Sequence, residues 1–369
     1  MIYLSIPDLR GNEWKYLKEC LDTNWITSVG HFLDDLEKSL ACFVGAKYAV
    51  ACSSGTAAMH VALGMLGVKA GDEVIVPATT FIATVNVVLY CQARPVMVDV
   101  DAKTFNMDPA GLAGAINDRT KVILPVHLYG QPCRMDKIMA IAESTGVPVL
   151  EDACESIGSR YKKKHTGTFG QISAFSFNGN KLITCGGGGM IVTDDEQLAR
   201  QARHLVTQAR SGELEYIHDA LGYNYRLTNM QAAVGLAQME RLGQMIDRRV
   251  AIFAKYQQAF EELPGWQGPS YVDGAESNCW LYTGLVDPEK FGMTSRELMG
   301  WLGEREIESR PIFAPACENK HLSCPDGRER FPVAYEIWER GIALPSSSGL
   351  SEEQIEKVIE AVRSAAGRS

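Results

Sequence analysis

The chain of 369 residues is long for a single domain and better fits one large and one smaller domain. Its composition, 46 % hydrophobic and 22 % charged, is that of a globular protein with a sizeable core. A formal net charge of −9 lacks the basic excess that binding to nucleic acids or anionic membranes requires, which argues against both kinds of partner.

Signals for export, membrane insertion and metal binding are weak. The first eight residues lack a basic region followed by an apolar run, and no segment approaches the roughly 18 apolar residues of a membrane span. The ten cysteines form no Cys-x-x-Cys pair and are spread through apolar segments, so we expect no metal site. The sequence therefore predicts a cytoplasmic protein whose thiols are reduced and buried.

Residues 1–45 are expected to form an N-terminal arm that carries two helices. The stretch 13–21 is amphipathic, and 31–44 places apolar residues at helical spacing before Gly45 ends the pattern. Between these stretches lies a hydroxyl-rich loop with one large aromatic residue, Trp25.

Short apolar runs alternate with helical segments between residues 47 and 152. The expected strands are 48–52, 73–76, 95–99, 121–124 and 147–150, and the expected helices are 57–66, 83–89, 109–116 and 135–144. This alternation is typical of an α/β fold with a mainly parallel sheet covered on both faces. Polar residues repeatedly follow the strands, where open α/β sheets bind their ligands.

The rest of the chain adds a second, smaller domain. We expect a polar turn at 161–165, strands at 172–177 and 190–193, a helix at 195–208, an irregular loop at 210–228 and one long helix at 229–263. Pro264-Gly265 separates a large domain, 1–264, from a smaller α+β domain, 265–369. The expected elements of the smaller domain are strands at 279–286 and 342–344 and helices at 295–305 and 352–365.

Lys181 lies between a predicted strand and four consecutive glycines, 186–189, with no other charged residue between Gly170 and Met190. Desolvation disfavours an ammonium, and a lysine in such surroundings can become a nucleophile or Schiff-base former. The alternative is a buried lysine with a packing role. The glycines match neither a Walker loop nor the dinucleotide fingerprint, which weighs against an NTPase or a nicotinamide enzyme.

Other strand-end residues leave two interpretations open. Gly55 and Thr56 begin a helix whose free amides could bind an anion, or the helix start is an ordinary cap. Asp152 either caps a helix or pairs with a buried positive group such as a pyridinium. Phe81 either stacks on a flat ring or belongs to the core. The loop residues Asn224 and Arg226 could serve an anion or an interaction patch.

Taken in order, these motifs resemble the sugar aminotransferases of the DegT/DnrJ/EryC1/StrS family, which are fold-type I pyridoxal phosphate (PLP) enzymes. The matching segments are Gly11-Asn-Glu-Trp, Thr23-Asn-Trp25, Ser54-Gly-Thr-Ala-Ala58, Phe81-Ile-Ala-Thr84, Pro125-Val-His127-Leu-Tyr-Gly130, Glu151-Asp-Ala-Cys-Glu155, Phe175-Ser-Phe, Gly222-Tyr-Asn-Tyr-Arg226, Arg310-Pro311 and Leu344-Pro-Ser346. The resemblance implies a mostly parallel seven-stranded sheet sandwiched by helices, followed by the smaller C-terminal α+β domain.

The resemblance also assigns residues to the cofactor ring. It implies that Lys181 binds PLP covalently, that Asp152 pairs with the ring nitrogen and that Phe81 stacks on the ring. Glu155 faces the ring at a position where the family often has Gln or His. Gly187 is a second departure, because the family often has Glu there.

The cofactor phosphate is assigned to Gly55, Thr56 and Ser176, with Asn224 reaching it from a second subunit. This cross-subunit contact implies a homodimer with shared active sites. A lysine at position 181 favours transamination over dehydration, because the dehydratases of the family carry His there.

The implied reaction transfers an amino group from L-glutamate to a nucleotide-linked keto sugar for polysaccharide or glycan synthesis. The segment 177–184 and the glycine run resemble the branch that aminates UDP-linked 4-keto-6-deoxy-GlcNAc at C4. A GDP- or dTDP-linked keto sugar, aminated at C4 or C3, is the alternative. Other classes are a PLP-dependent dehydratase and a non-catalytic binding relative. The residues expected to contact the donor carboxylate or the nucleotide sugar are Trp25, His218, Arg226 and Arg310.

Overall fold

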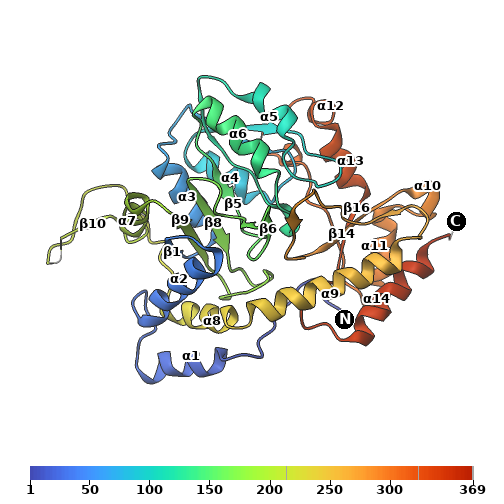
Figure 1. Ribbon diagram of the computed structural model, residues 1–369, viewed down its shortest axis with the longest axis horizontal. Helices are drawn as coiled ribbons and strands as arrows, with labels where there is room; N and C mark the ends of the chain where they lie inside the picture. The colour runs from blue at the N-terminus through green and yellow to red at the C-terminus, as the bar shows by residue number, and fades with distance from the viewer. Residues whose placement is uncertain (213, 323, 368–369) are drawn as a thin grey trace.

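The computed structural model describes residues 1–212, 214–322 and 324–367. Figure 1 shows a helix-covered sheet built from the first half of the chain, with a second sheet and its helices toward the C-terminus. The predicted α/β class is therefore confirmed.

Seven strands of the described chain form the main sheet in two hydrogen-bonded groups. One group has the order β3-β2-β4 and the other β5-β8-β9-β1. Two parallel bridges, Ile123 to Val149 and Val126 to Asp152, join β4 to β5. The strand bounds are β1 (Tyr48–Cys52), β2 (Glu73–Pro77), β3 (Arg94–Val98), β4 (Thr120–Ile123), β5 (Leu150–Asp152), β8 (Ile172–Ser176) and β9 (Gly189–Thr193). Among these seven strands, β9 alone runs in the direction opposite to the others, so it is antiparallel to both β1 and β8.

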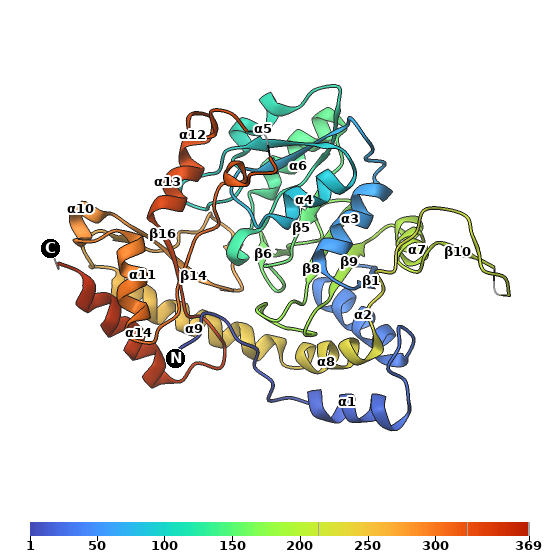
Figure 2. The same cartoon turned by 180° about the vertical axis from the view of Figure 1, so that it is seen from behind.

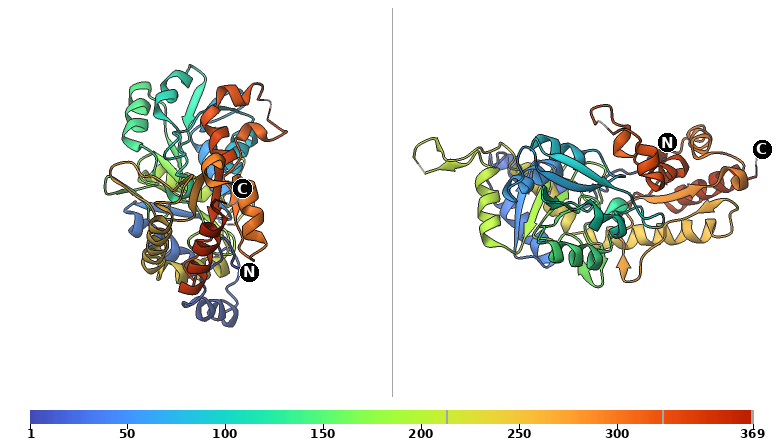
Figure 3. Two further views of the ribbon diagram at one scale, coloured as in Figure 1. Left: turned by 90° about the vertical axis from the view of Figure 1, so that its right-hand side faces the viewer. Right: turned by 90° about the horizontal axis from the view of Figure 1, so that it is seen from above.

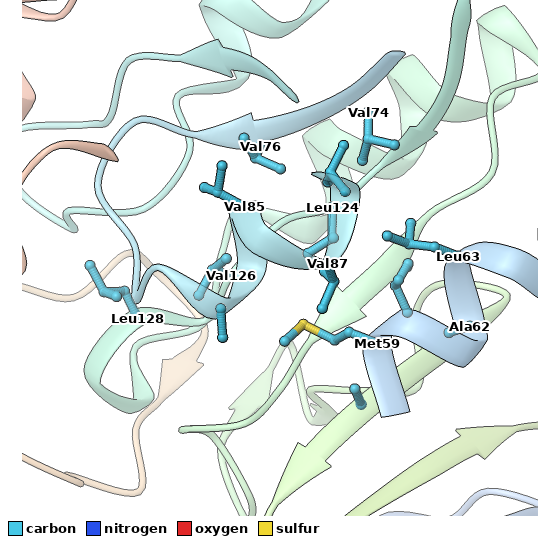
Figure 4. Close-up of a cluster of buried hydrophobic side chains, with 14 of the residues drawn as sticks. Met59, Ala62, Leu63, Val74, Val76, Val85, Val87, Leu124, Val126 and Leu128 are labelled. Atoms are coloured by element: carbon cyan, nitrogen blue, oxygen red, sulfur yellow. The ribbon is translucent and has the colours of Figure 1, made fainter. Parts of the chain in front are cut away.

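Both faces of this sheet are buried because its strands are apolar on both sides. Val74 and Val76 of β2 point into one core, whereas Ile75 points into another. The larger core packs the sheet against α3 and α4, and Figure 4 shows Met59 and Leu63 of α3 and Val85 and Val87 of α4 in one cluster with strand residues such as Val74 and Val76. A sheet enclosed in this way is what near-continuous apolar strands predict.

Helices enclose the sheet from both sides. On one face lie α3 (Gly55–Met65), α4 (Ala83–Tyr90) and α7 (Glu196–Leu205). On the other face lie α2 (His31–Val44), α5 (Pro109–Ala115), α6 (Met135–Thr145) and α8 (Asn229–Met239), and α1 (Glu13–Asp22) packs against α8 on the side away from the sheet. A short 3-10 turn, η1 (Leu128–Gly130), follows β4. Most predicted helices in this part begin or end within two residues of these bounds.

The C-terminal part has its own antiparallel sheet of order β12-β14-β16-β15, seen from behind in Figure 2. Its elements are β12 (Trp266–Gln267), β14 (Tyr282–Val286), α10 (Pro288–Phe291), α11 (Ser295–Gly303), β15 (Arg310–Pro311), η2 (Ala316–Glu318), α12 (Gly327–Arg330), α13 (Pro332–Arg340), β16 (Gly341–Leu344) and α14 (Glu352–Ala365). The strand predicted from Cys279 begins only at Tyr282, because Cys279 is left-handed (φ 55°). All four strands lie after residue 265, but the core that they share also includes Ile252, Phe253, Tyr256 and Phe260, and the boundary at Pro264-Gly265 stays a prediction.

The sequence analysis placed the whole N-terminal arm in the large domain, but its first residues contact the C-terminal part. Ile2 pairs with Ile307, and the amide of Leu4 donates to Glu308 at 3.0 Å. The first residues of the chain therefore pack on the C-terminal part.

The long helix predicted at 229–263 is two helices, α8 and α9 (Leu242–Phe260). The break falls at Glu240 and Arg241, whose side chains bond the N-terminal arm. Glu240 accepts from Asn12 at 2.7 Å, and Arg241 contacts Asp8 at 3.3 Å. The arm thus occupies the groove where the helix is interrupted.

The segment after α7 is irregular over most of its described residues, as predicted, but not over all of them. It contains a hairpin of β10 (Arg210–Ser211) and β11 (Ile217–His218) that projects from the body of the molecule in Figure 3. The polar turn at 161–165 is confirmed as the turn between β6 (Arg160–Tyr161) and β7 (Lys164–His165). A third strand, β13 (Ala275–Glu276), pairs with β6.

One pair of cysteines departs from the prediction of reduced thiols. Cys317 and Cys324 form a disulfide, and Cys42 is exposed rather than buried. Within the described residues, no helix combines the length and apolar character needed to cross a membrane.

Candidate active site

A cavity of about 320 Å³ lies at the edge of the main sheet where the parallel strands end. Its walls come from the segments after β1, β2, β4, β5 and β8, and from two aromatic residues of the C-terminal part. The lining residues are Ser54, Gly55, Thr56, Met59, Phe81, Ala83, Val126, Asp152, Cys154, Glu155, Ser176, Asn178, Asn180, Lys181, Gly187, Gly188, Trp280 and Phe313. This is the position at which open α/β sheets bind ligands.

Lys181 reaches this cavity from the loop between β8 and β9. Its Nζ lies 3.3 Å from Glu155 Oε1 and 4.1 Å from the centroid of the Trp280 ring. The side chain is 13 % exposed. Lys181 has no charged neighbour in the sequence between Gly170 and Met190, but the fold places the Glu155 carboxylate beside its amine.

Glu155 is buried next to Lys181. Burial raises the pKa of the Glu155 carboxyl above its usual value, while the Lys181 ammonium and the Tyr129 amide act in the opposite direction. The amide of Tyr129 donates to Glu155 Oε2 at 2.7 Å. Each carboxylate oxygen thus has its own partner.

Asp152 stands at the end of β5 with its carboxylate at the cavity wall. The hydroxyl of Thr84 donates to Oδ2 at 2.8 Å, and the amide of Cys154 donates to Oδ1 at 3.1 Å. Asp152 therefore caps only its own turn and not an α-helix. A carboxylate fixed in this way can pair with a positive group that enters the cavity.

The start of α3 lies at one end of the cavity. The Ser54 hydroxyl accepts the amide of Ala57, and the Ser54 carbonyl accepts the amide of Ala58. Across the described residues, no hydrogen bond occupies the amides of Gly55 and Thr56, which begin the helix. Free amides at a helix N-terminus favour an anionic group such as phosphate.

Two glycines make this end of the cavity possible. A Cβ on Gly55 would lie 2.6 Å from Cys154 Sγ and 2.9 Å from Ser176 Cβ. A Cβ on Gly189 would lie 2.4 Å from the carbonyl carbon of Ser54. The last glycine of the run therefore lets β9 pass directly beneath the start of α3.

Aromatic side chains close the cavity on the side of the C-terminal part. Tyr129 stacks between Trp280 and Phe313, at ring distances of 6.0 and 5.1 Å. Phe81 lies 5.6 Å from Phe313 and is 52 % exposed, so it is not a core residue. An exposed Phe81 ring at the cavity rim leaves a face free for stacking.

Sequence reasoning missed Trp280, Phe313 and Tyr129. Trp280 is positioned by Asn180, whose carbonyl accepts its indole N–H at 2.9 Å, and by the buried guanidinium of Arg249, which donates to its carbonyl. Tyr129 lies in the matching segment 125–130, although no role was expected for it, and the signal for Trp280 was a large aromatic residue shortly after the proposed domain boundary.

Five of the predicted site residues do not line the cavity. Asn224 is exposed, and its backbone pairs with Thr207. The backbone of Arg226 forms a β-bridge with that of Cys52 at the end of β1. Three others lie further out: the Trp25 side chain is 52 % exposed, the His218 ring contacts the Gln208 carbonyl at 2.7 Å, and Arg310 pairs with Glu308 at 2.8 Å.

Cys154 is a further potentially reactive group in the cavity. Burial raises the pKa of the Cys154 thiol well above its usual value, so it remains protonated and is a poor nucleophile. Lys181 is therefore the strongest candidate nucleophile among the residues that line the cavity.

The donor set fits pyridoxal phosphate. An amine for the aldehyde, a fixed carboxylate for the ring nitrogen and free helix amides for the phosphate all face one cavity. The fold and this site define the class of the protein as a pyridoxal phosphate enzyme of fold type I.

Comparison with known proteins names the family. The model of the DegT/DnrJ/EryC1/StrS aminotransferase family matches residues 7–363, so the chain belongs to this family. It is 42 % identical to the GDP-perosamine synthase of Caulobacter vibrioides over 365 residues, covering 98 % of this chain and 97 % of that protein. It is 40 % identical to the GDP-perosamine synthase of Escherichia coli O157:H7, covering 98 % of each chain.

Solved structures agree with this assignment. Spr1654 of Streptococcus pneumoniae, solved in PLP and pyridoxamine phosphate (PMP) forms, superimposes with a TM-score of 0.93 at 28 % identity, and the match covers 99 % of each chain in the PMP form. The predicted family, fold type and cofactor are thereby confirmed, and the protein is a PLP-dependent aminotransferase.

Proposed function

We propose that the protein transfers an amino group from L-glutamate to a keto sugar carried on a nucleoside diphosphate. The observation that carries this proposal is the convergence of Lys181, Asp152 and the start of α3 on one cavity. The names of the curated relatives support a GDP-linked sugar as the first candidate. The resemblance of segment 177–184 to the UDP-sugar branch supports a UDP-linked 4-keto-6-deoxy-GlcNAc as the second.

The residues divide the chemistry among them. Pyridoxal phosphate, when bound, supplies an electron sink for a carbanion at the reacting carbon. Lys181 Nζ holds the cofactor and, once its amine is free, takes the proton from that carbon and returns it. Asp152 keeps a proton on the ring nitrogen, while Gly55, Thr56 and Ser176 hold the phosphate. L-Glutamate leaves as 2-oxoglutarate before the keto sugar binds.

The rest of the site is proposed to come from a second copy of the chain. Asn224 lies outside the cavity of its own chain, close to the projecting hairpin. The hairpin region exposes apolar side chains, among them Leu214 at 94 % and Tyr216 at 81 %. Apolar groups of this size at an extended tip favour contact with a partner. We therefore propose a homodimer in which Asn224 completes the phosphate site of its partner.

Two half-reactions test the proposed function. L-Glutamate is expected to bleach the visible absorption of the PLP-loaded protein, and GDP-, UDP- and dTDP-linked 4-keto-6-deoxy sugars are then offered in turn. Return of the band with formation of an amino sugar supports the proposal and identifies the nucleotide. Loss of a sugar hydroxyl without amine transfer would indicate a dehydratase, and a band that does not respond to glutamate would indicate a non-catalytic relative.

A further inference from the structure

The pair formed by Lys181 and Glu155 is the best-defined charged contact in the cavity. Their atoms lie 3.3 Å apart, and the two side chains are 13 % and 4 % exposed. An ion pair with so little solvent around it is screened far less than a surface pair. Its charge should therefore have a measurable effect on the chemistry of the amine.

Glu155 is held so that it cannot easily turn away from Lys181. The Tyr129 amide binds its second oxygen at 2.7 Å, and Tyr129 itself is in the left-handed region at φ 53°. The side chain of Asn278 donates to the backbone carbonyl of Glu155 at 2.9 Å. The Tyr129 ring stacks on Trp280, whose ring lies over the Lys181 amine. Carboxylate, indole and amine thus form one fixed arrangement.

We propose that Glu155 is a positioning residue for Lys181: its carboxylate holds the Lys181 nitrogen against Trp280 and places one negative charge beside it. The inference rests on the PLP aminotransferase assignment and is independent of which sugar is used. Gln, which the family often has here, could keep the hydrogen bond but would lack the negative charge.

Other titratable groups face this pair. Asp152 is a second carboxylate near this pair, since its charge acts on Glu155 and on Cys154, and it is reserved for the ring nitrogen. Cys154 and Tyr129 contribute no charge, because burial raises the pKa of the Cys154 thiol and of the Tyr129 hydroxyl well above their usual values. Glu155 is therefore the negative charge that can be removed without removing the proposed partner of the ring nitrogen.

The test is the pH titration of visible absorption in the PLP-loaded protein, without any sugar. Glu155→Gln is expected to move the midpoint of the titration to lower pH by about one to three units, because a nearby opposite charge stabilises the protonated form by that amount. Glu155→Asp, which keeps the charge but draws it back, is expected to fall between Gln and the native residue. Glu143→Gln, which removes an exposed carboxylate on α6, is the matched control and should leave the midpoint in place.

A variant that does not retain the cofactor is compared by another measurement. The pH dependence of Lys181 acetylation in the full chain, measured by peptide mass spectrometry, is expected to shift in the same direction. An unchanged midpoint in Glu155→Gln by the measurement that applies would overturn the inference. Because no sugar is present, this result would leave the proposed amino-transfer reaction untouched.

Discussion

Two regions carry different parts of the predicted site: the cavity floor, formed by Asp152, Lys181 and the start of α3, and the projecting segment around 210–226. They differ in how firmly a single chain fixes their side chains. On the floor, Asp152 is 5 % exposed and its carboxylate is fixed by Thr84 and by the Cys154 amide. On the projecting segment, Asn224 is exposed and reaches no other predicted site residue. The floor residues meet at one cavity within a single chain, whereas His218 and Asn224 of the segment do not line that cavity.

This difference separates two kinds of sequence signal. A motif at the end of a strand is brought to the site by the sheet of its own chain, so its role can be checked in a monomer. A motif beside an extended hairpin is not brought to the site by the sheet of its own chain, so its proposed role depends on a second subunit. Variants in the two regions should therefore behave differently when subunits are mixed.

Replacing Lys181 by Ala tests the floor and should have the largest effect. We expect amino transfer to fall by at least about 10³-fold, because both the covalent link and the proton-transfer group are lost. Borohydride should no longer fix the cofactor to the chain. Lys137→Ala, at an exposed lysine on α6, is the control and should behave like the native protein. Reducible cofactor still bound to Lys181→Ala would contradict the assignment.

Replacing Gly189 by Ala tests how tightly the floor is packed. The new methyl group would clash with the backbone of Ser54, so we expect a loss of about 1–3 kcal/mol in the free energy of unfolding and weaker phosphate binding. Gly187→Ala in the same run is the control, because its Cβ would come no closer than 3.7 Å to Gln231. Equal unfolding midpoints in denaturant for the two variants would show that the close approach is unimportant.

Replacing Asn224 by Ala tests the projecting segment. PLP affinity is expected to fall about tenfold, the cost of one hydrogen bond to a charged group. At a PLP concentration well below the Kd of the Asn224→Ala variant, where that variant alone is mostly empty, mixing it with Lys181→Ala subunits should restore about a quarter of native activity, because half of the dimers are mixed and each has one intact site. Mixtures no more active than the separate variants would place Asn224 in the site of its own chain, or in none.

The fold and the cavity floor were largely predictable from the sequence. Apolar runs gave the strands of the main sheet, and Lys181 and Asp152 stood out because each ends or follows such a run. Both signals are local: a buried strand needs apolar residues, and a ligand site at its end needs a polar one.

The remaining features depend on contacts between distant segments. Trp280 faces Lys181 only because the second sheet folds back onto the first, and the sequence shows nothing of that approach. The pairing of Glu155 with Lys181 joins residues that are 26 positions apart. At the helix break, Glu240 accepts a hydrogen bond from Asn12 of the N-terminal arm, which is more than 220 residues away in the sequence. Local periodicity contains no information on any of these contacts.

The bridges that join the two strand groups have a consequence for thermal motion. Asp152 pairs with Ala174 of β8 on one side and with the segment 125–127 on the other, where its amide donates to Pro125 and its carbonyl accepts from His127. Its backbone therefore fluctuates with the whole sheet and not as a separate loop. Because seven strands of the described chain are joined in this sheet, Asp152 cannot move without moving its neighbours. The thermal displacement of its carboxylate should therefore be among the smallest in the molecule.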